Sequence, residues 1–317
     1  YNIGYAALPM DVAYAKAKIL GAAYQWYLKG FLKEVNAKVY YNFINHAMDD
    51  SQRPDVPIRM DMPGQSETWG AFVEGESAKI GRQSFFTKLE VFSNYRHAEM
   101  TMYPSNTAEP PMYMLTWPDV RKTSVLAFLK DEIAVGDKDK ITLSARLQKD
   151  FNDIVTDEGR AYLIPFGYTG PSTYLLPAID FSYAKYFSIK HAVSAHVGYT
   201  SRGPTTTEQY GFYLFNAYDG YDYIGAPNIL QENALKADLG YQFSLPLWHV
   251  DFNAFGYRIA NYILGVTQPD FDAMTFGANG VRVFQNVGNA HIYGADVTVS
   301  GELKSWLNLM GKIGYTR

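Results

Sequence analysis

The stretch Glu34-Val-Asn-Ala-Lys-Val-Tyr-Tyr-Asn-Phe-Ile-Asn-His46 decides the fold, because apolar and polar residues alternate along it. Residues two apart in a β-strand point to the same side of the sheet, so the stretch predicts a strand with one apolar and one polar face. Val35 and Phe43 fall on the apolar face. Continued without a bulge, the alternation places His46 and Met48 together on the polar face.

The same period recurs along the chain and predicts about twelve antiparallel strands. Many of them are longer than the ~5–6 residues usual in soluble sheets, which is typical of strands that cross a membrane. The strands are expected near residues 12–28, 33–47, 66–77, 83–97, 119–135, 140–150, 172–187, 191–201, 231–244, 248–263, 290–301 and 304–316.

The connections alternate in length, with short turns followed by long segments. A transmembrane β-barrel of the outer-membrane type has short turns on one side and long loops on the other, with its apolar face toward lipid. A soluble β-sandwich also explains the alternating strands, but it gives no reason for loop lengths to alternate. We therefore predict an all-β chain in which residues 1–317 form part of one barrel domain, and polar positions 36 to 42 and 142 to 148 line its lumen. The long loops are expected at 48–65, 98–118, 151–171, 202–230 and 264–289.

Composition excludes several classes of function. The net charge of −4 provides no basic footprint for nucleic acid, and the absence of cysteine excludes disulfides and thiolate metal sites within these 317 residues. The acidic clusters Asp49-Asp50, Asp219 to Asp222 and Asp270 to Asp272 do not match a full EF-hand calcium loop, and solvated loops explain them. No hydrolytic or phosphate-binding constellation stands out. The chain is therefore not expected to be an enzyme.

The methionines form a pattern of their own. Random placement of ten methionines in 317 positions predicts roughly 0.3 Met-x-Met pairs, whereas the chain has three. Thioether ligands select copper, above all Cu(I), over hard cations, so we predict His46 and Met48 as metal ligands and His97 as a possible alternative ligand. Packing of irregular gaps by methionine is the other explanation of the pairs. The residues predicted as capture groups on long loops are Met60, Met62, Met100, Met102, Met112 and Met114.

The second half of the chain resembles the TonB-dependent outer-membrane receptors. The segments Tyr199-Thr-Ser-Arg-Gly-Pro204, Glu208-Gln-Tyr-Gly211 and Tyr223-Ile-Gly-Ala-Pro-Asn228 look like that family's Arg-x-Pro, Glu-x-Tyr-Gly and Gly-Asn-Pro run. Asn286-Val-Gly-Asn-Ala290 followed by Tyr293-Gly-Ala-Asp296 resembles a later barrel segment, where Gly-x-Glu is usual. The departures, alanine for asparagine and aspartate for glutamate, are mild.

Within that family, Leu8-Pro-Met-Asp11, Val39-Tyr-Tyr-Asn42 and His46-Ala-Met-Asp-Asp50 are most similar to the copper receptor branch. The resemblance implies a barrel of about 22 strands around an N-terminal plug, with copper held by His46 and Met48 together with plug residues. The predicted twelve strands then imply that the plug and some terminal strands are not present in this chain. A closed barrel of twelve strands is the alternative.

The resemblance implies a TonB-dependent transporter for copper uptake in the outer membrane of a Gram-negative bacterium. Copper would be the transported substrate, no catalytic cofactor is expected, and the partners would be the TonB complex and outer-membrane lipid. One alternative is a receptor for an iron siderophore, a corrinoid or another organic nutrient. Another is a barrel that docks a surface protein or a lipoprotein lid. The aromatic residues that would build an organic pocket are Tyr210, Tyr213, Phe215, Tyr218, Tyr221 and Tyr223.

Overall fold

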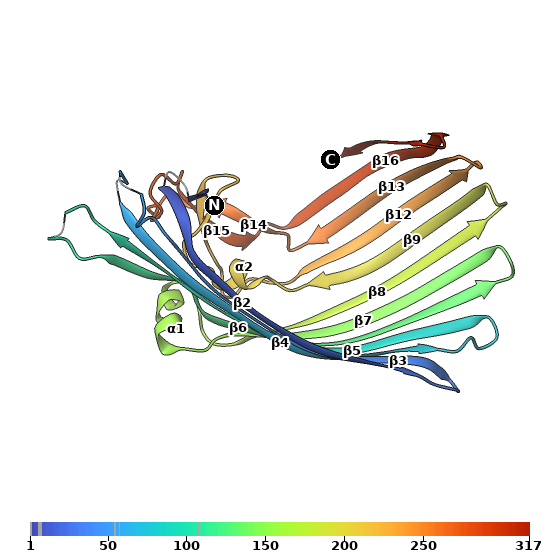
Figure 1. Ribbon diagram of the computed structural model, residues 1–317, viewed down its shortest axis with the longest axis horizontal. Coiled ribbons are helices and arrows are strands. Elements are labelled where there is room, and N and C mark those ends of the chain that lie inside the picture. Colours follow the sequence, from blue (N-terminus) through green and yellow to red (C-terminus); the bar gives the residue numbers. More distant parts are fainter. Residues whose placement is uncertain (1, 6–7, 54, 57, 107) are drawn as a thin grey trace.

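The computed structural model describes residues 2–5, 8–53, 55–56, 58–106 and 108–317, and its main element is one curved antiparallel sheet of 13 strands (Figure 1). Each of the predicted strands is present, and a short strand β1 is added at the N-terminal edge. In spatial order the strands are β1 (Asn2–Tyr5), β2 (Leu8–Tyr27), β3 (Leu32–Asp49), β4 (Arg59–Ser77), β5 (Gln83–Tyr103), β6 (Met112–Val135), β7 (Asp139–Ile154), β8 (Ser172–Tyr186), β9 (His191–Arg202), β12 (Glu232–Ser244), β13 (Trp248–Ala260), β16 (Asn289–Lys304) and β17 (Leu307–Thr316).

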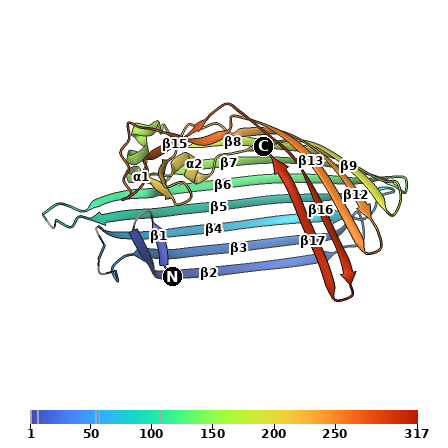
Figure 2. The same ribbon diagram turned by 90° about the horizontal axis from the view of Figure 1, so that it is seen from above.

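A second sheet of four strands is built from two of the connections predicted as long loops. Its order is β10 (Leu214–Asn216), β11 (Tyr221–Ile224), β15 (Val281–Asn286) and β14 (Ile263–Thr267), and β11 pairs with β15 in parallel. Two short helices, α1 (Asp157–Leu163) and α2 (Thr206–Tyr210), and the 3-10 turn η1 (Ile164–Phe166) occupy the same end of the strands (Figure 2). We call this the loop end and the opposite end, with its tight connections, the turn end.

The strand register carries one polar face across the large sheet. Lys38, Phe72, Glu90, Leu126 and Gln148 are successive cross-strand partners on β3 to β7, so the predicted polar positions of β3 and β7 share one side. Ion pairs join neighbouring strands on this polar face, as between Lys122 and Asp150 at 2.7 Å. The small sheet lies within the curve of the large one (Figure 1).

The opposite side is the apolar face. Val39, Val73, Leu89, Val125 and Leu147 lie on it, and each is between 41% and 56% exposed. An apolar surface that runs continuously over neighbouring strands has no packing partner inside the sheet, and it is the surface that a membrane-spanning barrel turns to lipid.

The large sheet is open. Within the described residues β17 pairs with β16 alone, and β1 and β17 stand at the two ends of the strand order. The chain is therefore not the closed twelve-stranded barrel considered as an alternative. The count of 22 strands and the absence of the plug stay predictions. No helix among the described residues has the length and hydrophobicity needed to cross a membrane.

Candidate functional site

Methionines form a buried cluster on the polar face at the loop end. Met60 on β4 pairs with Met102 on β5, which in turn pairs with Met112 on β6. One step toward the turn end, Met48 on β3 pairs with Met62, and Met100 pairs with Met114. Met10 on β2 belongs to the same cluster, which we call the methionine cluster. Its six fully or nearly buried members, with Met48 and Met112 packed against them, are Met10, Met60, Met62, Met100, Met102 and Met114.

The prediction that the Met-x-Met pairs lie on long loops is wrong, because β4, β5 and β6 extend through all three pairs. Side chains still alternate between the two faces there, but the apolar ones now lie on the inner face and the polar ones on the outer face. Met60 and Met62 are buried on the polar face, whereas Asp61 between them bonds the exposed Tyr103 hydroxyl. Beyond the apolar belt a strand's outer side meets water, so its inner side becomes the apolar one. The spacing of two in Met-x-Met is itself the strand period.

His46 and Met48 project from the same face of β3, toward the methionine cluster. Met48 packs against it, and His46 lies opposite Gly64 on β4, with Ala98 on β5 next in the row. A side chain at Gly64 would place its Cβ 3.2 Å from Cε1 of His46 and 3.5 Å from its Nε2. The imidazole therefore packs closely over Gly64. Three rows result, with thioethers in the two nearer the loop end and the imidazole in the third.

Replacement of Gly64 by alanine is expected to displace the His46 ring by a few tenths of an ångström. Changes to groups that support a metal ligand typically cost 10–100-fold in affinity, so Cu(I) binding at the predicted ligand His46 should weaken by roughly tenfold. Isothermal titration of the purified protein with Cu(I) measures this change in affinity. Gly75→Ala on the same strand is the matched control, because its nearest contact would be Leu32 Cδ2 at 3.5 Å. Equal affinity in both variants would show that His46 does not depend on Gly64.

His97, the predicted alternative ligand, does not join the cluster. Its Nδ1 lies 2.9 Å from Asp119 Oδ1 and its Nε2 lies 2.8 Å from Glu99 Oε1, so carboxylates engage both ring nitrogens. His97 also pairs with Gln65, one position out of step with Gly64 and Ala98, and it therefore projects from the other face. The structure separates His97 from His46 and Met48.

The small sheet covers the methionine cluster. Tyr213, Ile224 and Val281 are buried against the thioethers, and Phe212 packs beside them. Sulfur against aromatic rings is a favourable contact, and it leaves the methionine side chains adaptable. This cover was missed from the sequence because β11 and β15 are far apart in the chain and pair in parallel. Their own alternation, Tyr221-Asp-Tyr-Ile224 and Val281-Arg-Val-Phe284, is the available signal.

Buried carboxylates hold this end together. Asp50 accepts hydrogen bonds from the backbone amide of Met60 at 3.1 and 3.2 Å. Asp222 on β11 accepts from the amides of Met274 at 2.9 Å and Thr275 at 2.8 Å, and its burial raises the pKa of the carboxyl above its ordinary value. No group of three acidic or histidine side chains in the described ranges is arranged to hold a metal ion. Asp50 and Asp222 are therefore structural, whereas Asp270 and Asp272 are exposed.

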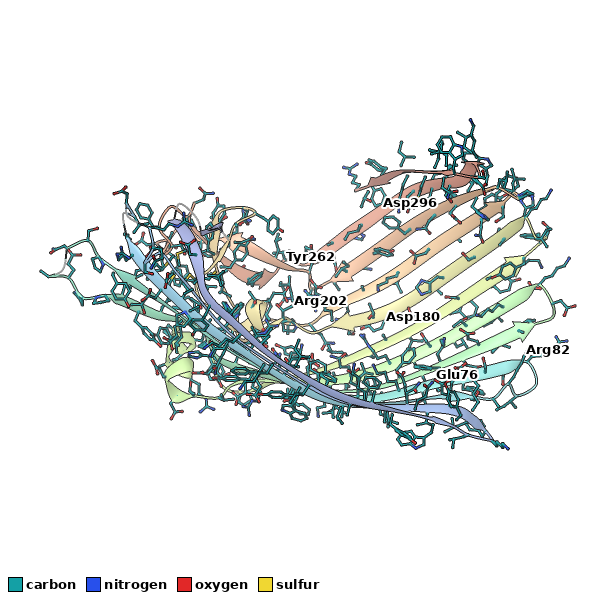
Figure 3. The ribbon with its side chains drawn as sticks, in the orientation of Figure 1. Glu76, Arg82, Asp180, Arg202, Tyr262 and Asp296 are labelled. Carbon is teal, nitrogen blue, oxygen red and sulfur yellow. The ribbon has the colours of Figure 1, made fainter. Side chains whose placement is uncertain are left out.

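Arg202, at the end of β9, anchors the polar corner from which the small sheet begins (Figure 3). Its guanidinium donates to Glu232 at 2.7 Å and to both carboxylate oxygens of Glu208 at 2.8 and 3.1 Å. Glu208 also completes a capping box with Thr205 at the start of α2. The Arg-Gly-Pro and Glu-Gln-Tyr-Gly segments are thus one hydrogen-bonded corner.

The tyrosines proposed for an organic pocket do not share one cavity. Tyr210 is fully buried in a separate core with Leu163 and Tyr168, whereas Tyr213 is buried over the methionines. Tyr218 is fully exposed, and Tyr223 donates to Asp219 at 2.6 Å. At the described loop end the methionines therefore gather in one cluster, whereas these aromatic residues are dispersed.

The family follows from comparison with known proteins. Residues 9–317 match the model described as "TonB dependent receptor-like, beta-barrel". The chain belongs to this family. Its members are β-barrels of the Gram-negative outer membrane and are transporters, not enzymes, so the apolar face is the lipid-facing wall and the polar face lines the lumen. A search of curated protein sequences finds no match.

Solved structures share the fold at low identity. The copper transporter OprC has a TM-score of 0.77 and 18% identity over 97% of this chain and 47% of its own. The ferric citrate transporter FecA has a TM-score of 0.64 and 12% identity, and covers 95% of this chain and 42% of its own. The ferric yersiniabactin uptake receptor FyuA from Yersinia pestis has a TM-score of 0.63 and 10% identity over the same shares. The chain thus spans less than half the length of these structures.

Proposed function

We propose that this chain is the barrel part of an outer-membrane transporter that takes up copper. The observation that supports it best is the convergence of eight of the ten methionines with His46 on the lumenal face at the loop end. Thioether and imidazole ligands together favour Cu(I), whereas hard cations prefer oxygen. The similarity to a copper transporter agrees with this substrate.

The three rows suggest an order of capture. Rows two residues apart on a strand are separated by about 7 Å. Met60, Met102 and Met112 would meet the ion first, Met48, Met62, Met100 and Met114 would hold it next, and His46 with Met48 would form the innermost and tightest part. Thioethers are weak neutral ligands, so an ion can move between them without a charged group having to be displaced.

Completion of transport would depend on parts of the receptor outside this chain. The resemblance implies that further ligands come from a lumenal plug and that a TonB complex energises release toward the periplasm. In this chain the cover formed by Tyr213, Ile224 and Val281 separates the methionine cluster from bulk water. An ion held among these thioethers would therefore be shielded from bulk water and from competing ligands.

The second candidate is uptake of an iron chelate or another organic nutrient, because iron receptors share the fold. The fold is common to both candidates, so the substrate has to be decided at the site. A barrel that docks a surface protein or lipoprotein lid is a third candidate, which predicts a stoichiometric partner and no retained metal.

Elemental analysis of the purified full-length receptor distinguishes these candidates. After incubation with Cu(I) under reducing conditions, or with ferric citrate, followed by desalting, we expect copper to be retained at one or more ions per receptor and iron not to be retained. Retention of the ferric chelate, or recovery of a partner protein without metal, would overturn the copper assignment. Competition with Zn²⁺ adds a control, because a thioether site discriminates against it more strongly than a carboxylate site does.

A further inference from the structure

The lipid-facing wall carries a small group of cations. Lys18, Phe43, Glu67, Tyr95 and Arg121 are successive cross-strand partners from β2 to β6, and their row belongs to the apolar face. A second row of this face runs through Val39, Ala71, Val91 and Val125 to Lys149 on β7. Lys18, Arg121 and Lys149 are all exposed and, with Lys16 on the same side of β2, project outward from a surface that is otherwise largely apolar.

These cations have aromatic rings but no carboxylates beside them. Lys18 Nζ lies 5.8 Å from the ring centre of Phe43, Arg121 Cζ lies 5.7 Å from that of Tyr95, and Lys149 Nζ lies 5.1 Å from that of Phe151. Within the described part of the chain no carboxylate oxygen lies within 4.0 Å of any of the three. Several cations on the polar face are instead paired with a carboxylate, as Lys122 is with Asp150.

The nearby carboxylates do not neutralise the group. Asp153 faces Arg121 across β6 and β7, but it accepts a hydrogen bond from the Tyr168 hydroxyl at 2.7 Å and lies 3.7 Å from Arg160. Glu67 stands in the same row, two strands away from both Lys18 and Arg121. The cations therefore leave net positive charge on this part of the wall.

Their height on the barrel is the second observation. Arg121 and Lys149 lie in the halves of β6 and β7 that are nearer the loop end, whereas Lys18 lies near the middle of β2. On the half nearer the turn end, the outward-facing Lys185 is instead paired with Asp139 at 3.4 Å. An unpaired cation is costly at the middle of the bilayer and tolerated near the headgroups, so Arg121 and Lys149 mark the level of one leaflet.

The apolar surface beside Lys149 is hollowed. A depression of about 1170 Å³ is lined by residues including Val39, Val125 and Leu147, with Lys149 and Phe151 among those that line it. Apolar walls of this kind fit acyl chains, and the lysine stem can run along them while its ammonium group reaches the headgroup level. The hollow and the cation together complement the two parts of an anionic lipid, because the hollow fits its acyl chains and the cation fits its headgroup.

We propose that Arg121 and Lys149, assisted by Lys18, bind the phosphate groups of a phosphorylated glycolipid in the outer leaflet, with its acyl chains in the hollow. Guanidinium groups match phosphate oxygens in pairs, and lysine supplies a point charge that snorkels to the same level. The ring contacts with Tyr95 and Phe151 keep both side chains extended along the wall. The interaction stabilises the receptor in its own membrane and is independent of the transported substrate.

The test compares lipid retention by the full-length receptor and by the double variant Arg121→Gln/Lys149→Gln. Native mass spectrometry counts bound bisphosphorylated lipid A after extraction into a mild detergent. We expect the double variant to bind at least tenfold more weakly, because each cation near an anionic lipid surface contributes a severalfold factor. Lipid A without its phosphates should bind the wild type and the double variant equally weakly. Millimolar inorganic phosphate should not displace intact lipid A from the wild type.

Two further variants keep the test decisive. Lys236→Gln/Lys312→Gln removes two cations from the polar face and should leave lipid A retention unchanged. Arg121→Lys/Lys149→Arg keeps the charge and should retain most of the binding, which separates loss of phosphate contacts from misfolding. Equal retention of lipid A by the wild type and Arg121→Gln/Lys149→Gln, or equal binding of lipid A with and without phosphates, would overturn the proposal.

Discussion

Replacing His46 and Met48 together by alanine is expected to weaken Cu(I) binding by at least about 100-fold, because changes merely in supporting groups already cost 10–100-fold. Both side chains project from one face of β3 at the inner edge of the methionine cluster. The His46 imidazole is the predicted nitrogen ligand beside the thioethers, since carboxylates engage both ring nitrogens of His97. Its removal leaves a set of neutral sulfur donors, which hold the ion less firmly. Competition with a chromogenic Cu(I) chelator measures the change.

The matched control is His249→Ala/Met310→Ala. These residues have the same chemistry, but His249 is on β13 and Met310 is 78% exposed on β17, and neither belongs to the cluster. We expect this variant to bind copper as the wild type does. Both double variants should keep their melting temperature within a few degrees, since none of the four side chains is fully buried. Unchanged copper binding by His46→Ala/Met48→Ala would refute the assignment of these ligands.

The strands and their faces were predictable from the sequence because lipid and lumen impose opposite polarity on successive residues. The stretch around Val39 shows this rule directly, and register then transfers it from Lys38 to Gln148. Since the period of a strand is two, the same rule predicts the common face of His46 and Met48. Local alternation is therefore sufficient wherever a strand crosses the bilayer.

The rule failed where the strands leave the bilayer. Near Met60 and Met102 the outer side is wet and the inner side is dry, so apolar residues change sides and the strands appear to end early. The small sheet escaped prediction for a different reason, because the parallel pairing of Tyr223 with Arg282 depends on a long-range contact. The role of Gly64 could not be predicted from the sequence either, since it depends on the space that this residue leaves for His46 in the folded sheet.

Substitution of Met62, Met100 and Met114 by leucine is expected to lower the number of Cu(I) ions bound, with little effect on stability. Leucine and methionine have similar volumes, and such exchanges usually cost less than about 1.5 kcal/mol each. Leucine has no sulfur, so it fills the cluster without supplying a ligand. Alanine would cost about 2–5 kcal/mol at each buried site and would confuse loss of packing with loss of ligands. Elemental analysis and thermal unfolding of the same preparation give both quantities.

The control exchanges Met274 and Met310, which lie outside the cluster and are 37% and 78% exposed, for leucine. If methionines merely fill the space beneath the small sheet, the triple leucine variant will bind as much copper as this control. If they are ligands, its capacity will fall while the tightest ion, which depends on His46, is retained. The reverse pattern is expected for His46→Ala/Met48→Ala, where the tight ion is lost and weak binding to the outer rows persists. Opposite losses in the two variants would therefore assign capture to the outer rows and retention to His46 and Met48, whereas parallel losses would show that the rows act as a single site.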